Sequence, residues 1–580
     1  MCGIAGFSYI NPDKKISKRF FNTERYLSHR GPENTGFFKN PHLDLIHTRL
    51  SIVDIKGGNQ PIQNKRYVLV ANGEIYNDPE IRKKNRTYKF VTNSDSESIL
   101  ALYERNGIDG LKLLRGMYAF IIYDKKRDEV IIGRDEFGIK PLYFSLMKNG
   151  IAFCSETKPI VSLKKSIPNI NVWKLFEYMQ LQYSSGTETL YEGIQRVAPG
   201  QILVIKRGKI IKSFLSSFTQ KKKSINDAEL IASLDKSLRE SVSSHLRSDV
   251  PYCIFFSGGI DSMLLLHYVH QLKKENVTAY SISFDEDTSK SLEKITQTYN
   301  VDLVKVKFSE DDFWNWIFLA AEKIDEPVAD YAILPTLKLA SIASKKYKVA
   351  LTGEGGDELF GGYGRYKKSQ RVLFGKKDYL PKGAFNDVLG SKKFQNWEYE
   401  LKNLNSFFLK NKVTRLQSFQ LFDYYNWLPN NLLVKLDRCL MTFSMEGRTP
   451  FIDKKLFNKL FYISDKEKIY NGVSKFYIRK FLNSNIQNYN FFEKKKGFTV
   501  PIYEWIPKKI NFLRELLLKQ DFLKEYFSKD ELVKICNATR INKKFVKPLW
   551  HIIFFTSWYL VNIKGIRKRG NFFDILADCN

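Results

Sequence analysis

The sequence predicts a multidomain α/β protein, in which a sheet-rich first part is followed by a parallel-sheet second part with a helical end. The chain has 580 residues, which is too many for one hydrophobic core. Up to about residue 212, short runs of β-branched and aromatic residues alternate with turn residues, as in sheets. From about residue 228, apolar strands alternate with helical patterns, as in βαβ units.

In the first part, strands are predicted within YVLVANGEIYN, MYAFIIYDKKRDEVIIGRDEFG, GIAFCSE and GQILVIKRGKIIKS. Helices are predicted over residues 17–28 and 96–106, and in the second of these Ile99, Leu100, Leu102 and Tyr103 share one face. We therefore expect helices packed on sheets.

A polar, lysine-rich stretch, SFLSSFTQKKKSIND, predicts a connection between the two parts. We divide the chain into a first domain over residues 2–212, a linker over 213–227 and a second domain over 228–580. In the second domain, YCIFF, TAYSISF and VALTG read as strands, MLLLHYVHQL and LKLASIASKKY as helices, and the pattern after residue 363 is mainly helical.

The net charge of +31 is the one unusual feature of the composition. Such an excess can attract nucleic acid or anionic lipid, or it can reflect anionic substrates. The lysines are spread along the chain and no recognised nucleic-acid-binding motif accompanies them. We expect no nucleic-acid partner, and the meaning of the charge stays open.

Cysteine usage and hydropathy indicate a cytoplasmic protein. The six cysteines contain no C-x-x-C pair, which fits a reducing compartment. The sequence NPD at residues 11–13 interrupts the first apolar run, so no secretory leader is predicted. The most apolar segment, residues 549–563, is too short for a span and contains polar residues. We expect it to form a buried helix and expect no membrane span.

The second domain contains two glycine-rich loops, each directly after an apolar strand. The first is SGGIDS, residues 257–262, where glycines and a helix N-terminus suit phosphate. It matches neither the G-x-x-x-x-G-K-[ST] loop nor the G-x-G-x-x-G loop. Asp261 would repel phosphates unless a cation intervened, and bound Mg²⁺ removes that conflict.

The second loop, GEGGDE at residues 353–358, carries three carboxylates. In a parallel sheet both loops leave the carboxyl ends of their strands, where such folds bind ligands. The two loops can therefore meet over one nucleotide, although either one alone could be an ordinary turn with a solvated acidic cap.

Cys2 is the third chemical feature, because removal of the initiator methionine would leave it with both a thiol and an α-amino group. The reference pKa of an α-amino group is about 7.7–8.0, so it can act as the base for its own thiol. None of the seven histidines is then required as a base. His267 and His270 have a helical spacing that could hold a metal, but ordinary helix-face histidines explain them better.

These features together resemble the glutamine-hydrolysing asparagine synthetases. SGGIDS looks like the pyrophosphate loop of ATP pyrophosphatases, and LTGEGGDELFGGY, LDRCLMTFSMEGRTPFID and KKKGFTVPIYEW resemble synthetase segments. MCGIAGF, SHRGPENTG, HTRLSIVD, ANGEIYN, SDSESIL and GRDEFGIKPLYF resemble the glutaminase half in the same order, so the resemblance covers nearly the whole chain.

The resemblance implies an N-terminal-nucleophile αββα sandwich followed by an adenine-nucleotide α-hydrolase-like domain with a helical C-terminal part. It implies glutamine hydrolysis at Cys2, adenylation of a carboxylate by Mg-ATP and transfer of ammonia through an internal passage. A homodimer is the family-based expectation. ATP is the implied co-substrate and Mg²⁺ the implied metal.

The residues implied by the resemblance fall into four groups. Catalytic roles are expected for Cys2, the oxyanion donors Asn72 and Gly73, and Glu354, which would handle protons as ammonia attacks. Glutamine binding is expected from Arg49, Leu50, Ser51, Ile52, Val53, Asn72, Gly73, Glu74 and Asp95. ATP binding is expected from Phe256, Ser257, Gly258, Gly259, Asp261, Ser262, Ile282, Thr352, Gly353 and Lys495. Metal binding is expected from Asp261 and Asp357.

The acceptor carboxylate stays open between alternatives. Residues 325–336, DEPVADYAILPT, lack the arginine that some aspartate-specific members place near here. We favour aspartate, with a sugar acid or a cell-envelope precursor as the alternative acceptor. A catalytically decayed, basic binding protein is the remaining reading, and Cys2, Asn72, Asp261 and Glu354 argue against it.

Overall fold

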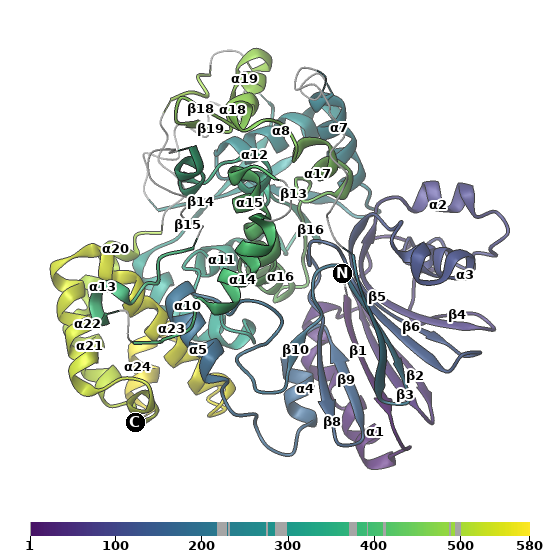
Figure 1. The fold of residues 1–580 in the computed structure, drawn as a ribbon, viewed down its shortest axis with the longest axis horizontal. Coiled ribbons are helices and arrows are strands. Elements are labelled where there is room, and N and C mark those ends of the chain that lie inside the picture. Colours follow the sequence, from purple (N-terminus) through teal and green to yellow (C-terminus); the bar gives the residue numbers. More distant parts are fainter. Residues whose placement is uncertain are drawn as a thin grey trace.

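The computed structural model describes residues 2–216, 229, 233–273, 276–284, 299–370, 380–390, 393–409, 413–486, 489–493 and 500–579 (Figure 1). Lys495 and most of the expected linker lie outside these residues.

The first part of the chain is built from two antiparallel six-stranded sheets. The first sheet has the order β10-β8-β9-β1-β3-β2, with bounds Gln195–Arg196, Tyr143–Met147, Gly150–Cys154, Cys2–Tyr9, Leu43–Arg49 and Asn34–Asn40. The second has the order β12-β11-β7-β6-β5-β4, with bounds Lys209–Leu215, Gln201–Lys206, Glu129–Arg134, Gly116–Asp124, Tyr67–Ile75 and Ile62–Gln63.

Helices cover the outer faces of both sheets, so the first part is a four-layer αββα sandwich. Between the sheets, strand residues such as Ile4, Val70 and Ile121 form a fully buried core. Helices α2 (Asp78–Lys84) and α3 (Glu97–Leu111) pack on the second sheet. On the first sheet lie α1 (Lys14–Phe21) and α4 (Thr157–Leu163). The fold expected for this part is confirmed.

The first helix differs from the predicted span over residues 17–28. Asp13 accepts hydrogen bonds from the backbone of Lys15 and Ile16, so α1 begins at Lys14. It ends at Phe21, because Thr23 bonds back to the carbonyl of Phe20, and 3₁₀ turns η1 (Glu24–Tyr26) and η2 (Ser28–Arg30) follow. The second predicted helix corresponds to the first part of α3, and its predicted end at Asn106 agrees with a kink at Gly107, where φ is +59° and ψ is −139°.

The second part contains a five-stranded parallel sheet with the order β15-β14-β13-β16-β17. The strands are Asp302–Lys307, Thr278–Ser283, Tyr252–Phe255, Val349–Leu351 and Glu446–Arg448. Among the helices around it are α7 (Leu234–His245), α8 (Ile260–Leu272), α10 (Glu310–Lys323) and α11 (Ile333–Ala343). The chain adds strands on one side of β13 and then on the other, so the strand order reverses between β13 and β16. Such a reversal is where open parallel sheets bind ligands.

The rest of the chain is mainly helical, as expected. After β16 come α12 (Gly356–Phe360), η3 (Gly364–Gln370), α13 (Asn386–Leu389), α14 (Tyr399–Leu409), α15 (Arg415–Phe422), the π-helix η4 (Asp423–Leu432) and α16 (Leu433–Met441). Then follow α17 (Lys454–Leu460), α18 (Asp465–Lys468), β18 (Ile469–Tyr470), β19 (Val473–Ser474), α19 (Phe476–Asn485), α20 (Ile502–Lys508), α21 (Ile510–Leu518), η5 (Asp521–Glu525), α22 (Lys529–Ile541), η6 (Lys543–Phe545), α23 (Val546–Asn562) and α24 (Phe572–Ala577).

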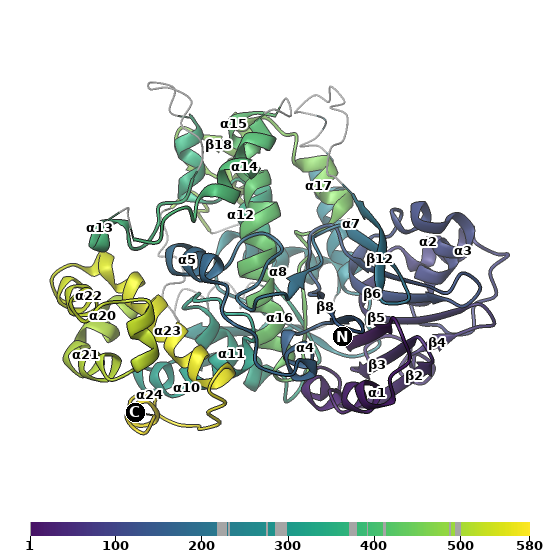
Figure 2. The same ribbon diagram turned by 60° about the horizontal axis from the view of Figure 1, so that its bottom comes forward.

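Helix α23 covers most of the apolar segment noted in the sequence, and nearly all of its side chains are buried against other helices. In the part of the chain that the structure describes, no helix is long and apolar enough to cross a membrane. Figures 1 and 2 show α5 (Val172–Leu181), from the first part, lying beside α23 among the C-terminal helices. The hydroxyl of Tyr178 on α5 donates to the carbonyl of His551 on α23 at 3.0 Å.

Candidate active sites

Cys2 begins strand β1 at the middle of the first sheet, where β3 and β9 flank β1. It is buried, and its backbone N–H donates to Oδ1 of Asn72 on β5 of the second sheet at 3.0 Å. Its carbonyl accepts from Nε of Arg30 at 3.2 Å. The end of the chain is therefore held between the two sheets by both of its backbone polar groups.

The thiol of Cys2 lies in an environment that favours the thiolate. Burial raises its pKa, but the electrostatic effects of His47 and of the chain terminus, with hydrogen bonds to His47 and to the Leu50 backbone, lower it to about 6. Burial raises the pKa of all the other cysteines: Cys154, Cys253, Cys439, Cys536 and Cys579. Cys2 is therefore the chain's reactive thiol.

His47 is a neighbour of Cys2 that the sequence reasoning missed. Cys2 pairs with Arg49 and Ile4 pairs with His47 across β1 and β3, so Cys2 and His47 project from the same face of the sheet. His47 is fully buried, and its side chain interacts with the thiol of Cys2. In the sequence HTR, His47 stands two residues before Arg49, and alternation along a strand places both side chains on one face. This spacing was the sequence signal that could have identified His47.

Asn72 and Gly73 lie on β5 of the second sheet, where Asn72 contacts the backbone of Cys2. Oδ1 of Asn72 receives the Cys2 backbone, which leaves Nδ2 buried with no partner in the described part of the chain. Gly73 has φ +150°, and a Cβ there would lie 1.9 Å from the carbonyl oxygen of Met117. An unused amide donor beside a thiolate can stabilise an oxyanion that forms there.

Arg49 presents a positive charge beside Cys2 with no carboxylate partner among the described residues. Its guanidinium donates to the carbonyls of Asp54 and Ile55, at 2.6 and 3.1 Å, and to Oδ1 of Asn59 at 2.8 Å. These acceptors orient the guanidinium but leave its charge available to a carboxylate ligand.

The loop after Arg49, residues 50–53, packs its apolar side chains against the second part of the chain. Leu50 and Ile52 are buried in a cluster with Val349 and Met441 of the second part, and Val53 packs against it. The backbone of Leu50 contacts the Cys2 thiol, so this loop reaches the thiol site through its backbone.

Two buried carboxylates, Asp95 and Glu74, lie at the end of β5 that carries Asn72 and Gly73. Asp95 accepts the backbone N–H of Ile75 at 2.6 Å, and burial raises its pKa to about 6. Burial, with the charge of Asp95, raises the pKa of Glu74 despite its contact with Arg448 at 3.2 Å, and Oε1 of Glu74 has no partner among the described residues. Carboxylates buried with free acceptor capacity suit an ammonium group.

The two glycine-rich loops meet at the point where the strand order of the parallel sheet reverses. The first follows β13 and opens α8, with Gly258 at φ +70° and Ser257 and Ser262 joined by their hydroxyls at 3.2 Å. The second follows β16 and opens α12. A Cβ on Gly356 would lie 2.4 Å from the carboxylate of Asp261, so the loops touch. The expected meeting of these loops is thus present in the structure.

Asp261 and Asp357 face one another across this contact, with Lys475 between them. The Nζ of Lys475 lies 2.5 Å from Oδ2 of Asp261 and 2.7 Å from Oδ1 of Asp357. Oδ1 of Asp261 is buried with no partner among the described residues. Two carboxylates with a free oxygen fit Mg²⁺, which is usually held by one or two carboxylates together with substrate phosphates. Lys475 was not foreseen from the sequence.

Glu354 lies on the other side of the second loop, beside a buried lysine. Nζ of Lys435 is 3.6 Å from Oε1 of Glu354 and 3.1 Å from Oδ2 of Asp330. Burial lowers the pKa of Lys435, but these two carboxylates raise it above its ordinary value, so the lysine is charged. The structure therefore places the charged Lys435 beside Asp330, which belongs to the arginine-free segment 325–336.

The remaining expected nucleotide residues line the same edge. Phe256 follows β13 and its N–H donates to the carbonyl of Tyr280 on β14, the strand that also carries Ile282. Thr352 and Gly353 follow β16, and a Cβ on Gly353 would lie 3.0 Å from Asp261.

A buried ion network connects the thiol site to the second part. Arg30, which holds the Cys2 carbonyl, donates two hydrogen bonds to Asp437 at 2.8 and 3.0 Å and a third to Glu156 at 2.9 Å. Asp437 lies on α16, the helix that also carries Lys435. One buried arginine thus joins the nucleophile's strand to the helix beside Glu354.

Comparisons with known proteins match both parts of the chain. A family model described as "Glutamine amidotransferase domain" matches residues 1–216, and one described as "Asparagine synthase" matches residues 233–560.

Three curated relatives are similar over most of their length. The asparagine synthetase [glutamine-hydrolyzing] 1 of Bacillus subtilis is 28% identical, covering 97% of this chain and 97% of the relative. The putative asparagine synthetase of Mycobacterium tuberculosis is 31% identical, with 87% and 88% covered. Asparagine synthetase B of Escherichia coli is 26% identical, with 87% and 83% covered.

Proposed function

The chain belongs to the family of glutamine-hydrolysing asparagine synthetases, and from this premise we propose that it makes asparagine from aspartate, glutamine and ATP. Glutamine and water give glutamate and ammonia at Cys2. Aspartate and ATP give β-aspartyl-AMP and pyrophosphate at the two glycine-rich loops, and ammonia displaces AMP. The observation that carries the proposal is that both constellations lie in one chain and are joined through Arg30.

At the first site, the α-amino group of the mature Cys2 takes the proton of its own thiol, and the thiolate attacks the side-chain amide of glutamine. Asn72 Nδ2 and the Gly73 backbone stabilise the resulting oxyanion. Arg49 binds the substrate's carboxylate, and Asp95 and Glu74 receive its ammonium. The free donor on Asn72 and the free oxygen on Glu74 support these roles. Water then hydrolyses the thioester to glutamate.

At the second site, the backbone of residues 257–262 and Thr352–Gly353 binds the phosphates of ATP. Asp261 and Asp357 would hold Mg²⁺, which when bound offsets the charge of the departing pyrophosphate. Lys475 neutralises the carboxylates and contacts the same phosphates. A carboxylate oxygen of the acceptor attacks the α-phosphorus and releases pyrophosphate. Lys495, outside the described residues, stays a predicted phosphate contact.

Aspartate is the acceptor that the charges beside Glu354 favour. Lys435 can bind the α-carboxylate of aspartate, and Asp330 can bind its α-ammonium group, which leaves Glu354 to take a proton from the attacking ammonia. Lys435 would then supply the charge that an arginine provides in some relatives. A sugar acid carries a carboxylate but no ammonium, so it would leave Asp330 without that partner.

The reaction is tested with purified protein, glutamine, Mg-ATP and a panel of carboxylates that includes aspartate and uronic acids. We expect aspartate-dependent formation of asparagine, AMP and pyrophosphate, measured by mass spectrometry and a coupled pyrophosphate assay. Amidation of a uronic acid instead would replace the acceptor but keep the mechanism. Formation of ADP and phosphate would exclude adenylation.

Matched variants separate the two sites. Cys2→Ala should abolish glutamine use but keep synthesis from added ammonia, and Cys579→Ala, at the partly exposed C-terminal end, should change neither. Glu354→Gln should lower synthesis from either nitrogen source but keep the glutaminase. Loss of both activities in Cys2→Ala would mean that Cys2 has a structural role. Size-exclusion chromatography with light scattering tests the expected homodimer.

A further inference from the structure

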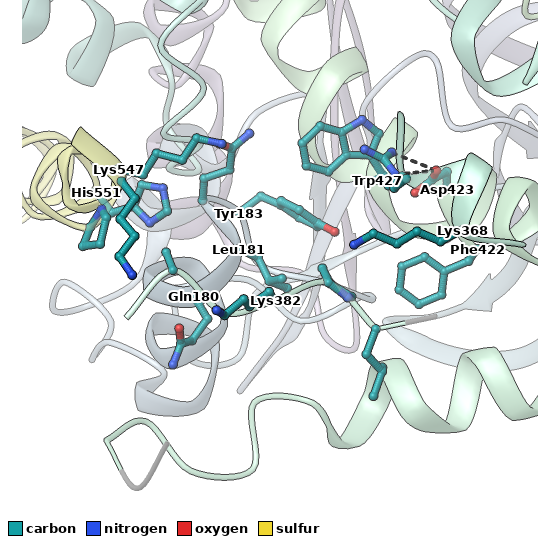
Figure 3. Close-up of a pocket in the computed structure, with 17 residues that line it drawn as sticks. Gln180, Leu181, Tyr183, Lys368, Lys382, Phe422, Asp423, Trp427, Lys547 and His551 are labelled. Atoms are coloured by element: carbon teal, nitrogen blue, oxygen red, sulfur yellow. Dashed lines mark hydrogen bonds and ion pairs between the residues drawn. The ribbon is translucent and has the colours of Figure 1, made fainter. Parts of the chain in front are cut away.

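A basic pocket lies away from both active sites, between α5, η3, η4 and the start of α23 (Figure 3). Its volume is about 330 Å³, which suits a small molecule. Segments far apart in the sequence supply its cations: Arg365 and Lys368 from η3, Lys382, Lys544 from η6 and Lys547 from α23. Figure 3 shows Lys368 extending toward Tyr183 and Trp427.

The positive charge of this pocket is only partly neutralised by protein carboxylates. Asp423, the one carboxylate among the described lining residues, binds Arg365 at 2.8 Å. Asp387 lies 2.7 Å from Lys382 and 3.5 Å from Lys544 and serves both. Lys368 and Lys547 have no ion-pair partner among the described residues. Gathering like charges in a concave site raises the free energy of the empty protein, and a bound anion offsets that cost.

The four lysines of the pocket are exposed at its rim, and the floor beneath them is polar and hydrogen-bonded. The side-chain oxygen of Gln180 accepts the backbone N–H of Phe385 at 3.0 Å, and its nitrogen donates to Asn386 at 3.1 Å. Nδ1 of His551 lies 2.6 Å from the carbonyl of Met179, and burial lowers the pKa of His551 to about 4, so the ring is neutral. These hydrogen bonds hold the floor of the pocket in place.

One wall of the pocket is continuous with the acidic loop of the second active site. The guanidinium of Arg365 lies 3.7 Å over the ring of Tyr363. The Tyr363 hydroxyl donates to Glu358 at 2.8 Å and accepts from the indole nitrogen of Trp427 at 3.1 Å. None of the residues proposed to bind glutamine, ATP or the acceptor lines the pocket itself.

We propose that this pocket binds a phosphorylated small molecule. Four of its five cations are lysines, whose compact ammonium groups suit the several oxygens of a phosphate, whereas the fork of Arg365 is already used by Asp423. A concave site of this volume cannot take a nucleic-acid strand, which needs an extended basic groove. The aromatic wall at Trp427 can also accommodate the organic part of a nucleotide. This site goes beyond the proposed synthesis of asparagine.

The test compares the wild type, the pocket variant Lys368→Ala/Lys547→Ala and the control variant Lys206→Ala/Lys209→Ala by isothermal titration calorimetry. Lys206 and Lys209 are exposed on the β11–β12 hairpin, so both variants lose the same net charge. The probes are inorganic pyrophosphate and ADP. Both variants keep the glycine-rich loops, so binding at those loops is common to all three proteins. Near-ultraviolet circular dichroism checks that each variant is folded.

We expect the pocket variant to lose one binding event or to show about tenfold weaker affinity in that event. The control variant should match the wild type. If the pocket variant loses the binding event with both probes, an inorganic phosphoanion is sufficient to fill the pocket. If it loses the event with ADP alone, the pocket requires a nucleotide. Either result supports the proposal. Equal titrations for all three proteins with both probes would overturn it, because every phosphate site would then lie elsewhere.

Discussion

Replacing His47 by Gln should raise the pKa of the Cys2 thiol and slow its reactions at low pH. His47 is the largest single influence that lowers this pKa, and it acts together with the chain terminus against the effect of burial. With a pKa of about 6, roughly 90% of the thiol is ionised at pH 7, against roughly 1% at the ordinary value of 9.0. Loss of the His47 side chain removes its electrostatic and hydrogen-bonding influence and should raise the pKa of Cys2 by about one pH unit, equivalent to about 1.4 kcal/mol.

The assay follows alkylation of Cys2 by iodoacetamide as a function of pH, using mass spectrometry of the N-terminal peptide. The other cysteines react slowly because burial raises their pKa values. At pH 5 the His47→Gln variant should react about tenfold more slowly than the wild type, and the two rates should converge near pH 9. His42→Gln, a change just before the same strand, is the matched control.

If the curve of alkylation rate against pH has the same midpoint in the His47→Gln variant as in the wild type, the electrostatic role assigned to His47 is refuted. A rate that falls equally at every pH would also refute it, because that result indicates altered access to the thiol.

The remaining predictions concern the oxyanion hole, the domain connection and the loop contact. Asn72→Ala should lower the rate of glutamine hydrolysis by about 10²–10³-fold and spare ammonia-dependent synthesis, measured as glutamate and asparagine formation. Arg30→Ala removes three hydrogen bonds to the buried Asp437 and Glu156, which keep Arg438 as a partner, and should lower the free energy of unfolding by about 1–3 kcal/mol, whereas Arg30→Met/Asp437→Leu should recover most of it in urea denaturation. Gly356→Ala places a methyl group 2.4 Å from Asp261 and should abolish pyrophosphate release while glutaminase activity persists. Glutaminase loss in this last variant would mean that the change disrupts the whole fold.

The sequence predicted those features that depend on local patterns. Each glycine-rich loop follows an apolar strand along the chain, so the positions of Ser257 and Gly353 at strand ends could be inferred from order alone. The sandwich fold, in contrast, came from resemblance, because a strand pattern does not state how two sheets face one another.

The features that were missed arise from tertiary contacts between distant segments. Lys475 and Lys435 look like ordinary lysines in the sequence, and only the packing of α16 and of the segment before α19 brings them to Glu354, Asp261 and Asp357. The ends of α1 depend on side-chain caps at Asp13 and Thr23, which move a helix boundary by several residues.

The central claim is that an acceptor carboxylate is activated as an acyl-adenylate, and an oxygen-label experiment tests it most directly. Aspartate labelled with ¹⁸O in its side-chain carboxylate is incubated with the protein, Mg-ATP and glutamine, and the products are analysed by mass spectrometry. Attack on the α-phosphorus predicts one labelled oxygen in AMP for each asparagine formed. Label in inorganic phosphate, or asparagine formed with unlabelled AMP, would contradict the account.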